Sequence, residues 1–168
     1  INAAKSSPHL EIFRKKDIEV LLLTDKIDEW VVGHLPTFEG KTLQSVAKGD
    51  LGLDEIEDNA ADKTEEEKKD KEHQTEFEPL LKKIQAILEK DVKEVRLSHR
   101  LTTSPACLVR DQNALGPQME RLLKAAGQAV PEAKPSLELN PEHMIVRKLQ
   151  TNTDDAKLEE WTRILFEQ

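Results

Sequence analysis

The chain has 168 residues, of which 37% are hydrophobic and 35% are charged, and its net charge at pH 7 is −8. One or two small domains are expected at this length, and the low hydrophobic content favours two modest cores joined by a polar segment. No apolar run of about 18 residues and no secretory signal pattern is present, so neither a membrane span nor a membrane partner is expected. Cys107 is the only cysteine. An internal disulfide is therefore excluded, and a reducing cytoplasm is the expected compartment.

The negative charge is concentrated in one stretch. Residues 54–78 contain twelve acidic and four basic residues, so they carry the whole net charge and leave the remainder neutral. A neutral body offers no basic face for phosphates, and nucleic-acid binding is therefore not expected. We interpret the acidic stretch as a solvated helix face or a flexible linker. A binding site for basic partners is the alternative.

The first part of the chain has the pattern of a small α-β-α unit. Ser7-Pro8 predicts an N-cap and first-turn proline of a short helix. Residues 18–23 form a nearly continuous apolar run, typical of a strand covered on both faces. Asp25 can cap a following helix, and residues 42–46 are a weaker second strand. Because a two-stranded sheet is marginal alone, we expect the chain to begin inside a domain.

A glycine-containing connection and a long charged helix are predicted next. Thr64 and Glu67 have the spacing of a capping box, which predicts a helix start at that point. Pro79 predicts a kink or a restart within this helix. The apolar face of the helix develops late and consists of Phe77, Leu80, Leu81, Ile84, Ile87 and Leu88.

The following stretch predicts the order β-β-α-β-α. Alternation over residues 95–101 indicates a strand buried on one face, with His99 on the apolar side as a structural histidine. Residues 106–109 are apolar on both faces and predict a central strand, in which Cys107 is a buried, inert thiol. A helix then runs to Gly127, a residue type that ends helices. A third strand follows at 135–139.

Two more helices complete the predicted α+β fold, in which helices pack on one face of a short sheet. Asn140-Pro141 predicts the start of the first of them. The second is predicted from about Asp154, with Thr153 as its cap. It is apolar on more than one side, which requires more than one neighbour and is typical of a helical bundle. Its apolar residues are Leu158, Trp161, Ile164 and Leu165 on one face, with Phe166 pointing away.

No motif for catalysis or metal binding is present. The five histidines form no i, i+4 pair and no HExxH, so there is no zinc ligand set. Gly49 to Gly52 lacks the ending of a phosphate-binding loop, and no GxSxG occurs. We therefore predict no catalytic, metal or cofactor site. An enzyme fragment has no support in the sequence.

Two apolar features have open interpretations. The helix that contains Met119, Leu122 and Leu123, preceded by Leu115, has a wide apolar stripe. This stripe either packs on the sheet or forms an exposed surface whose flexible side chains adapt to different partners. Trp30 is likewise either a half-buried core residue or part of such a surface.

Four segments resemble the heat-shock protein 90 chaperones, especially their bacterial HtpG branch. SHRLTTSPACLV, QMERLLKAAGQ and LELNPEH resemble the C-terminal domain of that family, and SPHLEIFRKKDIEVLLLTDKIDEW is similar to the end of its middle domain. The resemblance implies three regions. Residues 1–53 would end the middle domain, 54–76 would form an acidic connector that begins the long helix, and 77–168 would be the C-terminal dimerisation domain without its last helix.

The resemblance also implies a function. The parent protein would be an ATP-dependent chaperone that forms homodimers. ATP and Mg²⁺ would bind in an absent N-terminal domain, so this chain alone is expected to have no cofactor and not to be an enzyme. With one bundle helix missing, we expect this chain to be monomeric or to self-associate weakly. Residues implied to bind partly unfolded clients are Trp30, Leu115, Met119, Leu122 and Leu123. Residues implied in the dimer interface are Leu158, Trp161, Ile164, Leu165 and Phe166. The alternative is a purely structural assembly domain without client contact.

Overall fold

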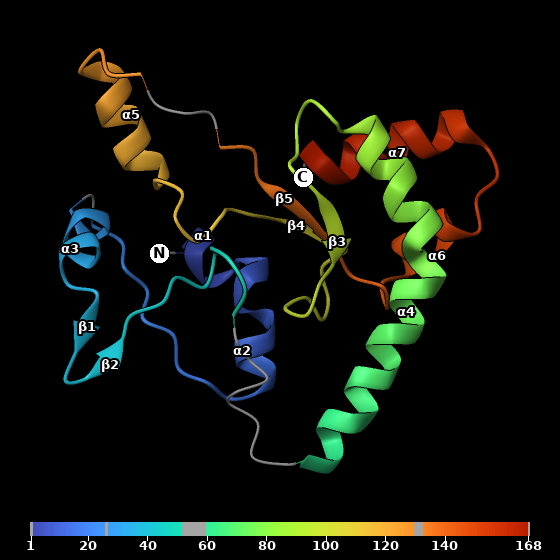
Figure 1. Cartoon of the computed structure of the whole chain (residues 1–168), viewed down its shortest axis with the longest axis horizontal. Helices are drawn as coiled ribbons and strands as arrows, with labels where there is room; N and C mark the ends of the chain where they lie inside the picture. The colour runs from blue at the N-terminus through green and yellow to red at the C-terminus, as the bar shows by residue number, and fades with distance from the viewer. Residues whose placement is uncertain (1, 26, 52–59, 130–132, 168) are drawn as a thin grey trace.

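The computed structural model describes residues 2–25, 27–51, 60–129 and 133–167, with side chains left out at 60–68 and at 117–118. The predicted mixed α+β class is confirmed: the described chain contains helices and two small sheets (Figure 1). The elements are α1 (Asn2–Lys5), η1 (Pro8–Leu10), α2 (Glu11–Lys15), α3 (Asp28–His34), β1 (Thr37–Phe38), β2 (Lys41–Thr42), α4 (Ala60–Ile87), β3 (Val95–Leu97), β4 (Ala106–Val109), α5 (Pro117–Ala125), β5 (Ser136–Leu139), α6 (Met144–Gln150) and α7 (Asp155–Glu167).

The larger sheet has the strand order β3-β5-β4. β5 runs parallel to β3 and antiparallel to β4, and all four of its residues are buried. The prediction that residues 106–109 form the central strand is therefore wrong. β4 lies at the edge of these three strands, where Leu108 is partly exposed, and β5 takes the centre. A short parallel bridge between Lys48 and Arg110 covers the end of the β4 edge.

The two faces of this sheet have different partners. Leu137 and Leu139 of β5 point, with Leu97 of β3, into the main hydrophobic core against α4, α6 and α7, which lie on the right in Figure 1. Glu138 faces the other way, because side chains alternate along a strand. The segments that precede α4 lie on this second side. The main core consists of Phe77, Leu80, Leu81, Ile84, Leu88, Val92, Leu97, Leu137, Leu139, Val146, Leu149, Leu158 and Leu165.

Helix α4 differs from its prediction at two points. It begins at Ala60, before the predicted capping box, so Thr64 lies inside the helix and is not its N-cap. Ala60 and Ala61 have high helix propensity and extend the helix in this direction. The helix is also continuous through Pro79 and does not restart there. The predicted connector begins at residue 54, and its first six residues lie outside the described ranges.

The N-terminal region confirms its first helix but not its first strand. Ser7 caps η1 by accepting a hydrogen bond from the His9 backbone N–H, and Pro8 begins the helix. The strand predicted over 18–23 is wrong: these residues belong to no strand, and Leu21 is 78% exposed. An apolar run becomes a strand only beside a partner, and the described chain places none there. The weak second strand predicted over 42–46 is confined to β2, which ends at Thr42.

Two helix starts differ from prediction, and one helix end agrees with it. Asn140-Pro141 does not begin α6; instead His143 is the N-cap, and its Nδ1 accepts from the Ile145 N–H. The Asn140 side chain accepts from the Glu142 N–H in the preceding turn. Helix α7 is capped one residue after the predicted Thr153, because Asp154 Oδ1 accepts from the N–H groups of the first turn. The prediction that α5 ends near Gly127 is confirmed, with a φ of 72° at that glycine. The proposed domain boundaries stay a prediction.

Candidate functional site

Helices α3 and α5 form an exposed apolar surface away from the main core. The two helices pack against each other at the left of Figure 1. At their contact the Glu29 carboxylate lies directly against Gly116, so that a methyl group added at position 116 would collide with it. Trp30 and Leu115 each lie one residue from this contact, which brings the two predicted positions into one region. We call the set Trp30, Leu115, Met119, Leu122 and Leu123 the α3–α5 surface.

The members of the α3–α5 surface are exposed to different degrees. Trp30 is 52% exposed and Leu122 is 64% exposed, and Leu115 is also exposed. Met119 and Leu123 are half-buried. None of the α5 side chains described, 119–125, is fully buried. The α5 stripe therefore does not pack as core in this chain, and an exposed apolar area of this kind is typical of an interaction site.

The α3 helix extends the apolar area beyond the predicted residues. No residue of α3 is buried. The Trp30 ring stacks on His34 with ring centroids 4.2 Å apart, and His34 Nδ1 lies 2.8 Å from the Trp30 carbonyl oxygen. The helical spacing predicts an apolar face on α3, but it does not predict that this face is exposed to solvent. Further exposed residues are Ile27, Val31, Leu35 and Phe38.

The predicted dimer-interface residues divide into two groups on α7. Leu158 and Leu165 are buried in the main core, and Phe166 packs against it. Trp161 and Ile164 are exposed on the outside of the helix. A single helix thus has one face occupied within the chain and a second apolar face open to a partner.

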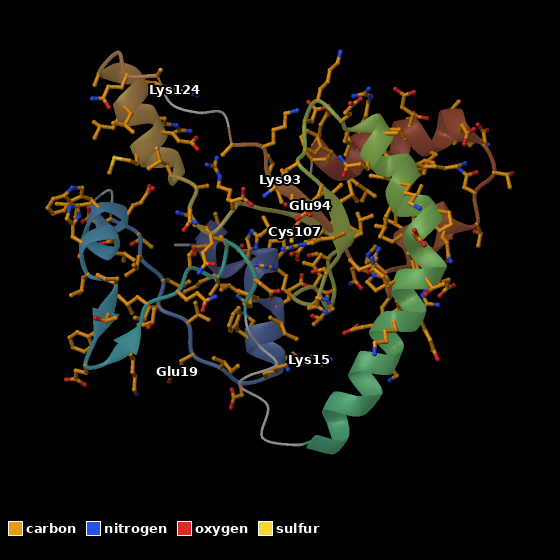
Figure 2. All side chains as sticks on the ribbon, viewed as in Figure 1. Lys15, Glu19, Lys93, Glu94, Cys107 and Lys124 are labelled. Carbon is orange, nitrogen blue, oxygen red and sulfur yellow. The ribbon has the colours of Figure 1, made fainter. Side chains whose placement is uncertain are left out.

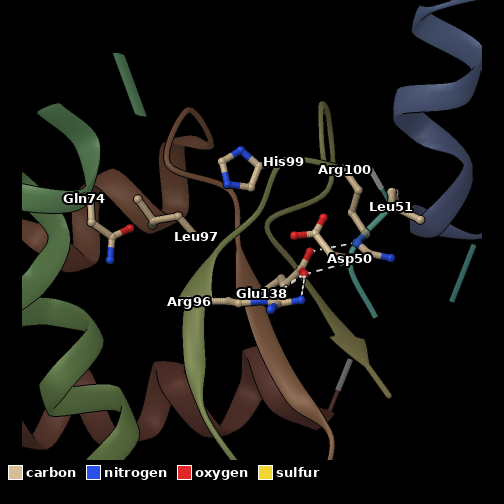
Figure 3. A pocket seen from close by; sticks show the side chains of 8 residues that line it. All are labelled: Asp50, Leu51, Gln74, Arg96, Leu97, His99, Arg100 and Glu138. Atoms are coloured by element: carbon tan, nitrogen blue, oxygen red, sulfur yellow. Dashed lines mark hydrogen bonds and ion pairs between the residues drawn. The ribbon is translucent and has the colours of Figure 1, made fainter. Parts of the chain in front are cut away.

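A buried ion-pair network joins the sheet to the preceding segment, and the sequence pattern missed it. Glu138 and Arg100 are both buried, and Arg100 Nε lies 2.8 Å from Glu138 Oε2. Arg96 Nη2 donates to the same carboxylate at 2.8 Å (Figure 3). Ser98 Oγ also donates to it, at 2.9 Å. Alternation over residues 95–101 predicts one buried face, formed by the apolar residues, and does not predict that Arg96, Ser98 and Arg100 on the opposite face belong to a buried network. The second layer that covers this face comes from residues distant in sequence, which local periodicity does not report.

Arg100 extends the network across the molecule. Its Nη1 and Nη2 donate to the backbone carbonyls of Val46 and Gly49, both at 2.7 Å. A cavity of about 230 Å³ lies beside the network, between α4 and the segment at Asp50 (Figure 3). The Arg100 and Glu138 charges at its wall are paired with each other. The network therefore fixes the position of the 46–49 segment on the sheet.

Glu11 makes a second connection between the N-terminal helices and the sheet. Its carboxylate accepts hydrogen bonds from the backbone N–H groups of Thr102, Thr103 and Ser104 and from the Ser104 hydroxyl. Partial burial acts to raise the pKa of Glu11, but the bonds from Ser104, Thr103 and Thr102 outweigh it and lower the pKa to about 2. The loop between β3 and β4 is thus held by a carboxylate that is ionised at neutral pH.

The histidines and the cysteine have structural surroundings. His99 is exposed and pairs with Asp70 at 3.4 Å, so its predicted place on the buried side is wrong. The reason is that β3 ends at Leu97 and its alternation stops there. Burial, and then the nearby Arg100 charge, lower the pKa of His9. Cys107 is buried as predicted, and burial raises the pKa of its thiol to about 12.

The described residues form neither a metal site nor a membrane-spanning helix. No group of three or more His, Cys, Asp or Glu side chains there has the arrangement to hold a metal ion. Within the same ranges, no helix has the length and apolar character needed to cross a membrane.

Comparison with known proteins shows the family of this chain. The model of the Hsp90 protein family matches residues 1–168. The chain belongs to the Hsp90 family. It is similar to the chaperone protein HtpG of Aromatoleum aromaticum, with 54% identity over 167 residues, 99% of this chain and 25% of that protein. HtpG of Alkalilimnicola ehrlichii is 52% identical over 167 residues, 99% of this chain and 25% of that protein. HtpG of Legionella pneumophila (strain Lens) is 51% identical over 167 residues, 99% of this chain and 26% of that protein.

The chain is much shorter than the relatives it matches. The chain spans about a quarter of the length of the HtpG relatives it matches. The α3–α5 surface, the α7 face and the polar network therefore represent a part of what such a protein contains. The chaperone family is established for this chain by its own residues.

Proposed function

We propose that this chain is the client-binding and dimer-forming part of an Hsp90-type chaperone. The observation that carries the proposal is the α3–α5 surface, where Trp30 on α3, Leu122 on α5 and Leu115 in the loop before α5 are exposed. Partly unfolded proteins expose apolar side chains, and an open surface with flexible Leu and Met side chains can contact many of them. ATP binding and hydrolysis would belong to another part of the longer, cytoplasmic protein.

The proposal is tested by suppression of aggregation. A heat-unfolded model protein is incubated with the chain, with Leu122→Asp and with Met144→Asp. Met144, on α6, is a matched control because it is 65% exposed, against 64% for Leu122. We expect the chain and the control to suppress light scattering, and Leu122→Asp to have lost most of this effect. Equal suppression by both variants, with folding intact by circular dichroism, would remove α5 from the client surface.

A second candidate function is a purely structural assembly domain, and the exposed α7 residues Trp161 and Ile164 favour it. Under the main proposal these two residues also contribute to a homodimer of the longer protein. We expect this chain to self-associate weakly, since two exposed side chains on one helix bury little area compared with a stable interface. Sedimentation velocity measures this. A dimer that persists at nanomolar concentration would contradict weak association and would strengthen the assembly-domain interpretation.

A further inference from the structure

A small set of polar contacts lies at the N-terminal end of α5. Arg110 Nη1 donates to the Leu115 carbonyl at 3.1 Å and to Glu120 Oε1 at 2.7 Å. Lys48 Nζ donates to the Ala114 carbonyl at 2.7 Å. We call Arg110, Glu120, Lys48 and these two carbonyls the α5 clasp. Its two cations hold the loop that leads into the helix and the first turn of the helix itself.

The clasp is anchored in the sheet. Arg110 follows β4, and its backbone pairs with the 47–49 segment: its carbonyl accepts from Gly49 N at 2.8 Å, and its N–H donates to Ala47 O at 3.3 Å. Arg100 fixes the same segment by donating to the Gly49 carbonyl. The backbone at Arg110 and at Lys48 is therefore held in place at the sheet. The side chains of these two residues can lose their contacts to α5 while the sheet stays in place.

The rest of α5 has few other means of support. Its described side chains are exposed or half-buried, and it stands apart from the main core in Figure 1. In Figure 2 the Lys124 side chain, in the last turn, lies far from Cys107 in the sheet. Helix α5 also contacts α3, where Glu29 lies against Gly116. If the contacts of the α5 clasp are lost, α5 is expected to change its orientation relative to the sheet.

We propose that Arg110 is a positioning residue that sets α5 in the orientation in which Leu115, Met119 and Leu122 face the same client as Trp30. This inference rests on the proposed function of the α3–α5 surface. The Arg110–Glu120 pair is only partly exposed, with side-chain exposures of 33% and 19%, so it is less screened than a surface pair. Arg110 does not contact the client. It raises the fraction of molecules in which both helices are aligned.

The size of the effect follows from population arithmetic. When only a fraction of the molecules is competent to bind, the apparent Kd rises by the inverse of that fraction. Loss of one partly exposed ion pair shifts such an equilibrium by up to roughly fivefold. We therefore expect Arg110→Gln to weaken client binding by up to about fivefold, while the apolar surface itself is unchanged.

The experiment combines a distance measurement with a binding measurement. Spin labels are placed at Lys124→Cys on α5 and Lys148→Cys on α6, and the distance distribution is measured by pulsed electron paramagnetic resonance. Cys107 stays unlabelled at neutral pH, because it is buried and its thiol pKa is about 12. Binding of fluorescein-labelled, reduced and carboxymethylated lactalbumin is measured by anisotropy for the unlabelled variants.

Three variants separate positioning from general charge effects. Arg110→Gln is expected to broaden the distance distribution and weaken binding. Arg110→Lys keeps a cation opposite Glu120 and is expected to restore most of both. Arg147→Gln is the matched control, because it removes an equal charge and an ion pair of 2.9 Å with Glu142 that lies outside α5. It is expected to change neither.

The outcomes decide both proposals separately. If Arg110→Gln leaves the distance distribution narrow, or if Arg147→Gln weakens binding equally, positioning by Arg110 is wrong. If Leu122→Asp binds lactalbumin as well as the unmodified chain does, the proposed client surface is wrong. In that case the distance distribution still tests whether Arg110 orients α5. If Leu122→Asp loses binding while Arg110→Gln keeps it, the client surface stands and the clasp is refuted.

Discussion

The main core and the α3–α5 surface are built from similar sequence patterns but differ in what covers them. Helix α4 has an apolar face that is buried against β3, α6 and α7, with Ile84 and Leu88 fully inaccessible. Helix α3 has an apolar face of similar spacing, yet none of its residues is buried. Amphipathic periodicity thus predicts which side of a helix is apolar. Whether that side is core or open surface depends on a partner that the helix itself does not specify.

The largest effect is expected where the two parts of the molecule meet. In Glu138→Gln, Arg100 loses the charge that compensates its buried guanidinium, and breaking such a pair costs about 4 kcal/mol of unfolding free energy. Urea denaturation measures the loss. Glu142→Gln is the control, since the Glu142 side chain is 63% exposed and its pair with Arg147 contributes less than about 1 kcal/mol. Equal losses in the two variants would show that the network does not stabilise the fold.

The second comparison places the same substitution in each region. Leu139→Ala removes a fully buried side chain from β5 and is expected to lower the unfolding free energy by about 3 kcal/mol, because a cavity remains. Leu122→Ala on α5 is expected to change it by less than about 0.5 kcal/mol. Both are measured by urea denaturation. A loss at Leu122 similar to that at Leu139 would mean that α5 packs as core and does not form an open surface.

The third effect concerns Glu11 and depends on pH. In Glu11→Gln the charge-assisted hydrogen bonds to residues 102–104 are weakened, and we expect a loss of about 1–2 kcal/mol at pH 7, discounted because the carboxylate is partly exposed. The folded pKa of Glu11, about 2, lies below its usual 4.5. Its stabilisation is therefore complete above pH 4.5 and is lost as the pH falls toward 2. The difference in unfolding free energy between the two proteins should shrink over that range. A difference independent of pH would contradict the role of the ionised carboxylate.

The predicted elements of the C-terminal region agree with the structure because local patterns determine them. The order of β3, β4, α5 and β5 follows from alternation, helical spacing and the stop at Gly127. The family resemblance is likewise confirmed over the whole chain. The order of the strands within the sheet is not determined by local patterns. β5 is the central strand because it pairs with two strands that are distant in sequence. Residues 106–109 are apolar on both faces, and this pattern alone does not distinguish a central strand from a covered edge.

The polar contacts were less predictable than the apolar ones. Arg100, Glu138 and Glu11 are ordinary charged residues in a chain rich in charge, and no spacing marks them as a network. Their partners lie about 40 to 90 residues away in sequence. The predicted client residues rest largely on the family resemblance, and the structure shows that Trp30 and Leu115 lie next to the contact between Glu29 and Gly116. The residues that orient this surface, Arg110 and Glu120, had no distinguishing signal in the sequence.

The smallest expected effect is that of Ile164→Ala on α7, and the adjacent Leu165 serves as its comparison. Leu165 lies in the main core, whereas Ile164 is 52% exposed. Leu165→Ala is expected to lower the unfolding free energy by about 3 kcal/mol. Ile164→Ala is expected to change the unfolding free energy by less than about 0.5 kcal/mol. Urea denaturation at low protein concentration measures both in the absence of self-association. At high concentration, Ile164→Ala should lower the sedimentation coefficient only if the exposed face of α7 joins two chains. A destabilisation by Ile164→Ala similar to that by Leu165→Ala, already at low concentration, would mean that this face is occupied within the chain and is closed to a partner.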